Sequence, residues 1–169
     1  MASKRTPAGV VALGGVLAAL AVVIMSMGTL IPVATYVCPM LCAVLLKVVL
    51  NACGKRIAWA WYGAVAILSL LIGPDKEAAA VFVFFGFYPI IKPKFDKSRL
   101  KWLWKLLYFN ILILLMYSLL IHIFGMAELA EEWQELGFVM TAVMLVLGNV
   151  TFLLLDRVLS RNIWRRKHG

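Results

Sequence analysis

The chain has 169 residues, of which 64% are hydrophobic and 15% are charged, and its mean hydropathy is +0.95. Soluble domains have about half apolar and about a quarter charged residues, so this composition excludes a soluble globular protein. The net charge of +9 does not indicate nucleic-acid binding, because the cations lie at the ends of apolar runs, where anionic membrane lipid attracts them. The sequence therefore predicts an all-α, polytopic membrane protein with a single integral membrane domain.

The apolar runs divide the chain into six predicted transmembrane helices, because a helix needs roughly 20 apolar residues to cross the hydrocarbon core of a bilayer. The expected spans cover about residues 8–28, 30–52, 57–73, 77–91, 103–124 and 136–155. Lysine and arginine residues gather before the first span, between spans two and three, between spans four and five, and after the last span. Since short basic loops stay in the cytoplasm, both termini are predicted to be cytoplasmic.

The first span carries a face of small residues at helical spacing. Its members are Ala8, Ala12, Gly15 and Ala19. An adjoining stripe consists of Gly14, Ala18 and Ala21. Small residues let helices approach closely, which is a main source of helix association in lipid. Two interpretations remain open here: packing against another span of this chain, and docking of a separate protein.

The second span contains Tyr36 between Pro32 and Pro39, which predicts a kinked or irregular outer half of the kind that often accompanies a binding site. Cys38 and Cys42 lie one helical turn apart in the same span. No histidine or acid near them in the sequence completes a ligand set, so they are interpreted as packing residues. No metal and no cofactor is predicted.

The turn between the third and fourth spans reads GPDKE, with Asp75, Lys76 and Glu77 in succession. The apolar runs on either side, residues 57–72 and 78–91, are about 24 Å and about 21 Å long as helices, against roughly 30 Å of hydrocarbon. We therefore expect a recessed turn, where charged side chains are candidate ligand contacts. The alternative is that the two acids simply begin the fourth helix at its positive N-terminal dipole, with Lys76 reaching to the membrane surface.

Polar residues in the last two spans fall at two depths. Tyr117, His122 and Thr141 lie in the outer half and are candidate substrate contacts, although an interfacial His122 is also unremarkable. Asn110 and Asn149 lie in the inner half, where an asparagine is expected to hydrogen-bond a neighbouring helix. Between these spans, residues 125–137 predict a short amphipathic helix on the outer surface, either a lid or a connector.

The sequence contains no GxxxxGK[ST] loop, HExxH or GxSxG motif, so neither ATP hydrolysis nor another catalytic activity is predicted. Six spans with cytoplasmic ends, the small-residue first helix ALGGVLAALAVVI and a polar outer layer resemble the substrate-capture (S) components of energy-coupling factor vitamin transporters. The resemblance implies that the first-helix face docks onto a transmembrane coupling subunit driven by two cytoplasmic ATPases. It also implies a vitamin site on the outer side, near Tyr36, residues 75–77 and the acidic segment.

The sequence thus predicts a non-enzymatic, substrate-binding subunit of an ATP-driven importer for a vitamin or other small micronutrient, spanning a bacterial plasma membrane several times. The candidate substrate contacts are Tyr36, Asp75, Lys76, Glu77, Tyr117, His122 and Thr141. The alternative is a structural or assembly membrane protein that binds no small molecule and organises a partner protein through the first-helix face.

Overall fold

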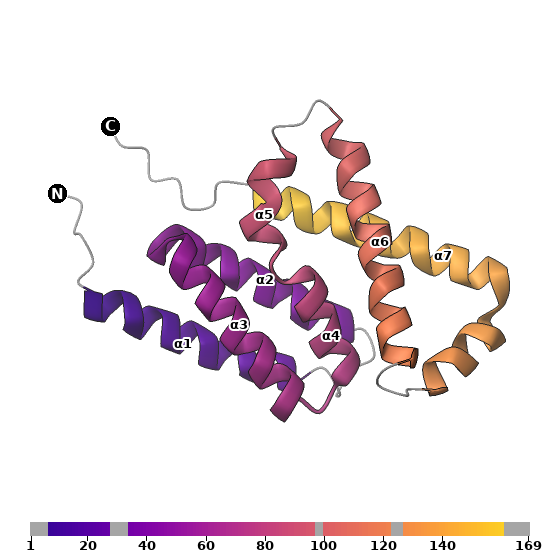
Figure 1. Cartoon of the computed structure of the whole chain (residues 1–169), viewed down its shortest axis with the longest axis horizontal. Helices are drawn as coiled ribbons and strands as arrows, with labels where there is room; N and C mark the ends of the chain where they lie inside the picture. The colour runs from indigo at the N-terminus through magenta and orange to yellow at the C-terminus, as the bar shows by residue number, and fades with distance from the viewer. Residues whose placement is uncertain (1–6, 28–33, 97–99, 123–126, 161–169) are drawn as a thin grey trace. The chain divides into compact units, whose positions relative to one another are not determined.

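The structure is a computed structural model that describes residues 7–27, 34–96, 100–122 and 127–160 (Figure 1). Every regular element within these ranges is a helix, which confirms the expected all-α class. The chain divides into two compact units, Met1–Pro93 and Lys94–Gly169. Each unit has its own helix packing.

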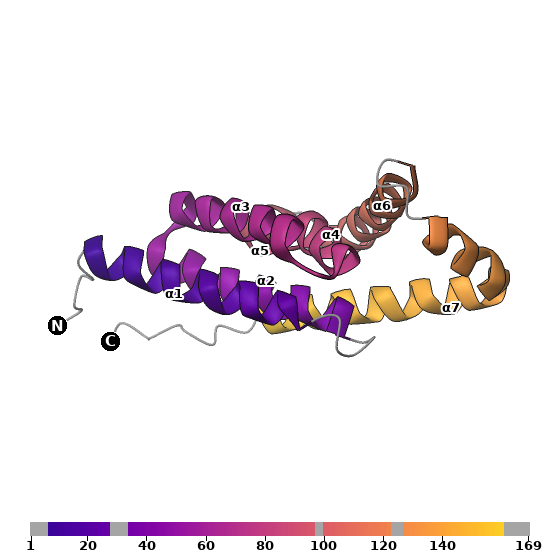
Figure 2. The same ribbon diagram turned by 90° about the horizontal axis from the view of Figure 1, so that it is seen from below.

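The first unit contains four complete helices and most of a fifth helix. They are α1 (Pro7–Ser26), α2 (Ala34–Cys53), α3 (Lys55–Ile72), α4 (Lys76–Phe85) and α5 (Tyr88–Phe95). Helix α2 packs against α1, α3 and α4, and α1 also packs against α3. In the view of Figure 2, α1 and α2 form one layer of this unit and α3 and α4 form the other. The core lies between the layers, around the fully buried Leu46, Val49, Val65 and Phe82.

Five helical segments among the described residues are long and apolar enough to cross a membrane. They are Ala8–Ser26, Thr35–Cys53, Lys55–Ile72, Lys76–Phe95 and Trp102–His122. Five of the six expected spans therefore match one of these segments. The expected start of the second span and Pro32 lie outside the described residues, while Pro39 lies inside a helix that continues from Ala34 to Cys53.

The fourth span differs from the expectation in length and continuity. It reaches Phe95 instead of ending near residue 91, and it is interrupted at Gly86 and Phe87 between α4 and α5. Pro89 has no N–H to donate to the Phe85 carbonyl, which accounts for a break at this point. The Tyr62 hydroxyl of α3 donates a hydrogen bond to the Val83 carbonyl beside the break, so the backbone stays satisfied.

This extension changes the expected dimensions of the third and fourth spans. They have 18 and 20 residues, or about 27 Å and about 30 Å as helices. Lys92, expected in the cytoplasmic connection, is instead buried within α5. A hairpin of this length matches roughly 30 Å of hydrocarbon, so length gives no reason for the turn at residues 73–77 to lie recessed.

The second unit contains α6 (Lys101–His122) and α7 (Ala127–Ser160). Helix α7 is interrupted at Gly137, whose φ of 67° is a conformation that side chains with a Cβ rarely adopt. The interruption separates helical residues 127–136, expected as an amphipathic segment, from residues 138–160, which contain most of the sixth expected span. The interruption at Gly137 lies where the two expected segments overlap, at residues 136 and 137.

Helices α6 and α7 are joined by a pair of part-buried side-chain amides at their interface. The side-chain nitrogen of Asn110 donates to the Asn149 side-chain oxygen over 3.1 Å, and Asn149 donates back over 3.2 Å. Next to this pair the rings of Phe109 and Phe152 stack with centroids 4.9 Å apart. The expected interhelical role of both asparagines is confirmed, because each side chain hydrogen-bonds the other across the two helices.

Candidate functional site

The first unit gathers polar side chains where the N-terminus of α2 meets the turn between α3 and α4. We call this group the α2–α4 polar cluster, and its members are Thr35, Tyr36, Asp75, Lys76 and Glu77. Four of the five are predicted substrate contacts. Thr35 was missed, although its position beside Tyr36 at the start of the same helix was a usable signal.

Asp75 is the N-cap of α4 and also binds α2. Its Oδ1 accepts a hydrogen bond from the Ala78 N–H over 2.9 Å, and its Oδ2 accepts one from the Thr35 hydroxyl over 2.8 Å. A carboxylate in this position satisfies an end group of the helix and interacts favourably with the helix dipole. The helix-start interpretation is therefore correct for Asp75, and the bond to Thr35 adds a link between two helices.

Glu77 provides the second link between the turn and α2. Its Oε1 accepts a hydrogen bond from the Tyr36 hydroxyl over 2.9 Å. Glu77 is half-buried, whereas Tyr36 is 43% exposed. This contact therefore lies at the rim of the unit, where a ligand can reach the phenol and the carboxylate.

Lys76 folds back onto the end of the preceding helix. Its Nζ donates to the Leu70 carbonyl over 2.8 Å and to the Gly73 carbonyl over 3.1 Å. These carbonyls lie at the C-terminus of α3, where an ammonium group also offsets the negative end of the helix dipole. Lys76 thus binds the C-terminus of α3, whereas Asp75 and Glu77 both bind the N-terminus of α2.

This arrangement presents hydrogen-bond acceptors at an accessible edge. The carboxylates of Asp75 and Glu77 accept bonds from the hydroxyls of Thr35 and Tyr36. Ionised carboxylates only accept hydrogen bonds, so a ligand with O–H or N–H groups can replace the two hydroxyls one for one. The cluster is suited to a small molecule that carries such donors.

The remaining predicted contacts belong to the second unit. Tyr117 is half-buried on α6, and His122 lies at the exposed end of that helix with its Nδ1 2.9 Å from the Ser118 carbonyl oxygen. Thr141 lies on α7, and its side chain is outside the part that the structure describes. The structure therefore brings Tyr36, Asp75, Lys76 and Glu77 together in one group. Tyr117, His122 and Thr141 belong to the second unit and are not part of that group.

The two small-residue stripes of α1 have different surroundings. Gly14 and Ala21 are buried, and their carbonyls lie 3.1 Å from the Trp61 indole nitrogen and 3.5 Å from the Cys42 sulfur. The predicted partner face is exposed along its whole length and consists of Ala8, Ala12, Gly15 and Ala19. Internal packing is therefore the role of the adjoining stripe, and within the first unit the predicted face is left uncovered.

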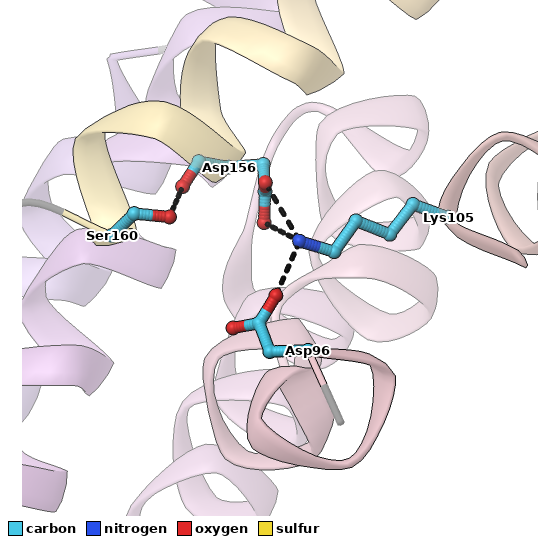
Figure 3. A network of polar contacts seen from close by, with 4 residues as sticks. All are labelled: Asp96, Lys105, Asp156 and Ser160. Carbon is cyan, nitrogen blue, oxygen red and sulfur yellow. Dashed lines mark hydrogen bonds and ion pairs between the residues drawn. The ribbon is translucent and has the colours of Figure 1, made fainter. Parts of the chain in front are cut away.

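The second unit contains a charged group that the sequence analysis did not single out (Figure 3). The Nζ of Lys105 lies 2.6 Å from Asp96 Oδ1 and 2.9 Å from Asp156 Oδ2. The side chains of Lys105 and Asp156 are 5% and 9% exposed, whereas that of Asp96 is 42% exposed. We call these three residues the Lys105 triad.

A signal for the Lys105 triad was present in the sequence. Asp96 and Asp156 are the only acids within residues 94–105 and 154–169, which are otherwise strongly basic. An acid retained in such a segment indicates a specific cationic partner. The identity of that partner depended on the fold, because several lysines and arginines lie equally near in the sequence.

Comparison with protein-family models found no match for this chain, and neither did comparison with curated proteins or with solved structures. Functional inference therefore depends on the residues and on their geometry.

Proposed function

We propose that the protein is the substrate-binding membrane subunit of an ATP-driven importer for a vitamin or other small micronutrient, without enzymatic activity of its own. The observation that carries this proposal is the α2–α4 polar cluster, in which a half-exposed phenol and two carboxylates from distant parts of the chain meet at one edge of a helical unit. Small-molecule sites typically combine apolar surroundings with a small number of converging polar groups.

The partner side of the proposal rests on α1. Its exposed face of Ala8, Ala12, Gly15 and Ala19 allows close approach of another transmembrane helix. The proposed occupant is a transmembrane coupling subunit, itself driven by two cytoplasmic ATPases, since the chain carries no nucleotide-binding loop. This assembly is the one implied by the resemblance to S components, and we place it in a bacterial plasma membrane with both termini cytoplasmic.

One observation favours the alternative of a structural or assembly protein without a ligand. Asp75, Lys76 and Glu77 all have hydrogen-bond partners within the first unit, at the ends of α2, α3 and α4. In that case the cluster only joins helix ends, and the α1 face organises a partner for a different purpose. Ligand retention distinguishes the two functions.

Asp75→Asn and Glu77→Gln are each expected to lower retention of a co-purifying small molecule by at least about tenfold, equivalent to about 1.4 kcal/mol. Asparagine is as good an N-cap as aspartate, so Asp75→Asn removes the charge and keeps the start of α4. Mass spectrometry of small molecules extracted from the purified protein measures the retention. Glu131→Gln, at an exposed position of α7, is the control and is expected to retain the molecule fully.

A cysteine scan of residues 74–77 supplies an independent measurement. A membrane-impermeant thiol reagent is expected to label these positions without the small molecule and to be blocked when it is added. Equal labelling in both states, with unchanged retention in the two charge variants, would assign the cluster to helix joining and support the structural alternative.

The orientation is tested by reporter fusions. A reporter placed after His168 and another inserted between Lys94 and Lys101 are both expected to give a cytoplasmic signal, because basic residues surround each position. Paired alkaline phosphatase and fluorescent protein fusions measure the side directly. A periplasmic signal at either position would contradict the six-span topology.

A further inference from the structure

No charged residue lies within Pro7–Ser26, so helix α1 is apolar on every side. Because lipid tails are as apolar as its side chains, apolar burial does not select which side of α1 faces lipid. Gly14 and the partly buried Ala18 belong to the inner stripe. Gly15 and Ala19, each one residue later, lie on the exposed face, and a rotation of about 100° exchanges the two pairs. Another interaction has to fix the rotation of α1.

Three side chains of α2 and α3 donate hydrogen bonds to backbone carbonyls of α1. The donors are Cys53, Trp61 and Cys42, and their acceptors are, in the same order, the carbonyls of Val10, Gly14 and Ala21. The two sulfur atoms lie 3.7 Å and 3.5 Å from their carbonyl oxygens, and the indole nitrogen lies 3.1 Å from its own. The three carbonyls extend over about 16 Å of the helix at 1.5 Å per residue. These bonds therefore hold one side of α1 against α2 and α3.

Trp61 supplies the strongest of the three bonds. A thiol is a weak donor, whereas the indole N–H of tryptophan is an ordinary donor with no alternative role. Trp61 is only 5% exposed, so its N–H depends on the Gly14 carbonyl. A rotation of α1 at constant height carries that carbonyl away from the indole, and a buried N–H without an acceptor is costly. The Trp61 N–H therefore opposes rotation of α1 more strongly than either thiol does.

We propose that Trp61 is a positioning residue for the exposed small-residue face of α1, which includes Ala12 and Gly15. Its bond to Gly14 turns this face away from α2 and α3 and presents it to another transmembrane helix. Trp61 is buried and acts only through the backbone of α1. This role rests on the proposed docking of a coupling subunit, and it names the residue that sets the orientation in which the subunit meets α1.

Nitroxide labels at the two edges of the exposed side measure the rotation. Val11 and Leu20 are 70% and 45% exposed and lie on opposite edges, so labels at these positions leave the core intact. Electron paramagnetic resonance of the full chain in liposomes reports how often each label meets oxygen dissolved in the lipid. Val11→Cys and Leu20→Cys are labelled separately in chains whose three native cysteines are replaced by serine, which keeps a hydrogen-bond donor at each position.

Trp61→Phe keeps an aromatic ring and removes the N–H. We expect the ratio of oxygen accessibility at Val11 to that at Leu20 to change by at least about twofold, because rotations of similar free energy then share the population. One label gains accessibility while the other loses it, whereas a general loosening of the unit raises both. Co-purification of the coupling subunit from the cells of origin is expected to fall by about twofold or more, since only the original rotation presents the face.

Trp59→Phe is the matched control, because Trp59 lies on the same helix and its ring packs against Tyr62 and Phe87. It is expected to change neither the accessibility ratio nor the amount of partner. An unchanged ratio in Trp61→Phe, an equal change in Trp59→Phe, or a changed ratio with full retention of the partner would each overturn the positioning role. A wild-type chain that co-purifies no subunit would instead contradict the proposed function, and the label ratio would still decide whether Trp61 sets the rotation.

Discussion

Replacing Lys105 by methionine is expected to lower the free energy of unfolding by about 3 to 5 kcal/mol. The substitution takes away the ammonium group 2.9 Å from the buried Asp156 carboxylate, and removing one partner of a buried ion pair is costly. Asp96 contributes less, because its side chain is 42% exposed and can turn toward water. Reversible unfolding in mixed detergent micelles, followed by circular dichroism, measures the change.

Two variants separate the loss of the ion pair from a general loss of charge. Lys94→Met removes an exposed lysine and is expected to change the unfolding free energy by less than about 0.5 kcal/mol. Lys105→Met with Asp156→Asn is expected to recover much of the lost stability, because no charge remains buried. A loss below about 1 kcal/mol for Lys105→Met alone would mean that water reaches the pair.

Ala12→Leu with Gly15→Leu is expected to abolish co-purification of a coupling subunit while the protein remains folded. Both positions are exposed, and a Cβ built at Gly15 has no neighbouring atom within 4 Å, so the first unit can accept the larger side chains. A partner helix that approaches this face closely would meet them directly. Affinity purification from the cells of origin, in which the proposed partner is present, measures co-purification, and the melting temperature of the variant measures its fold.

Controls for this result lie on the same helix. Leu20→Phe adds bulk at an exposed position outside the small-residue face and is expected to keep the partner. Ala21→Leu places bulk in the buried stripe and is expected to destabilise the protein by about 1 to 3 kcal/mol through overpacking. Unfolding of the Ala12 and Gly15 variant, or full retention of the partner, would contradict the proposed docking face.

Several elements followed from local sequence with little ambiguity. Long apolar runs bounded by charges predicted the helices, because every backbone polar group in lipid must be satisfied within the segment itself. Asn110 and Asn149 were assigned to interhelical bonding on the same basis, and their reciprocal amide pair confirms it. A helix start at Asp75 was one of the two interpretations left open for the turn, and the bond from the Ala78 N–H to its carboxylate agrees with it.

The fourth span shows where local patterns misled the prediction. Lys92 and the prolines around it favoured an early end of the helix, yet the chain continues to Phe95 with Lys92 buried. The break at Gly86 is accommodated because the Tyr62 hydroxyl from α3 binds the Val83 carbonyl. The pattern of prolines alone did not reveal this contact from another helix, which satisfies the backbone at the break.

By itself, the sequence determined that this is a helical protein with several membrane-spanning segments. The reason is that the composition and the length of each apolar run set the free energy of placing that segment in water or in lipid. Only the tertiary structure decided which α1 stripe is internal, that Tyr36 binds Glu77 across 41 residues, and that Lys105 selects Asp156 across 51 residues. Such choices depend on side chains that meet after the helices have packed. Many cations near Asp156 have the same charge, and only the geometry of α6 against α7 makes Lys105 its partner.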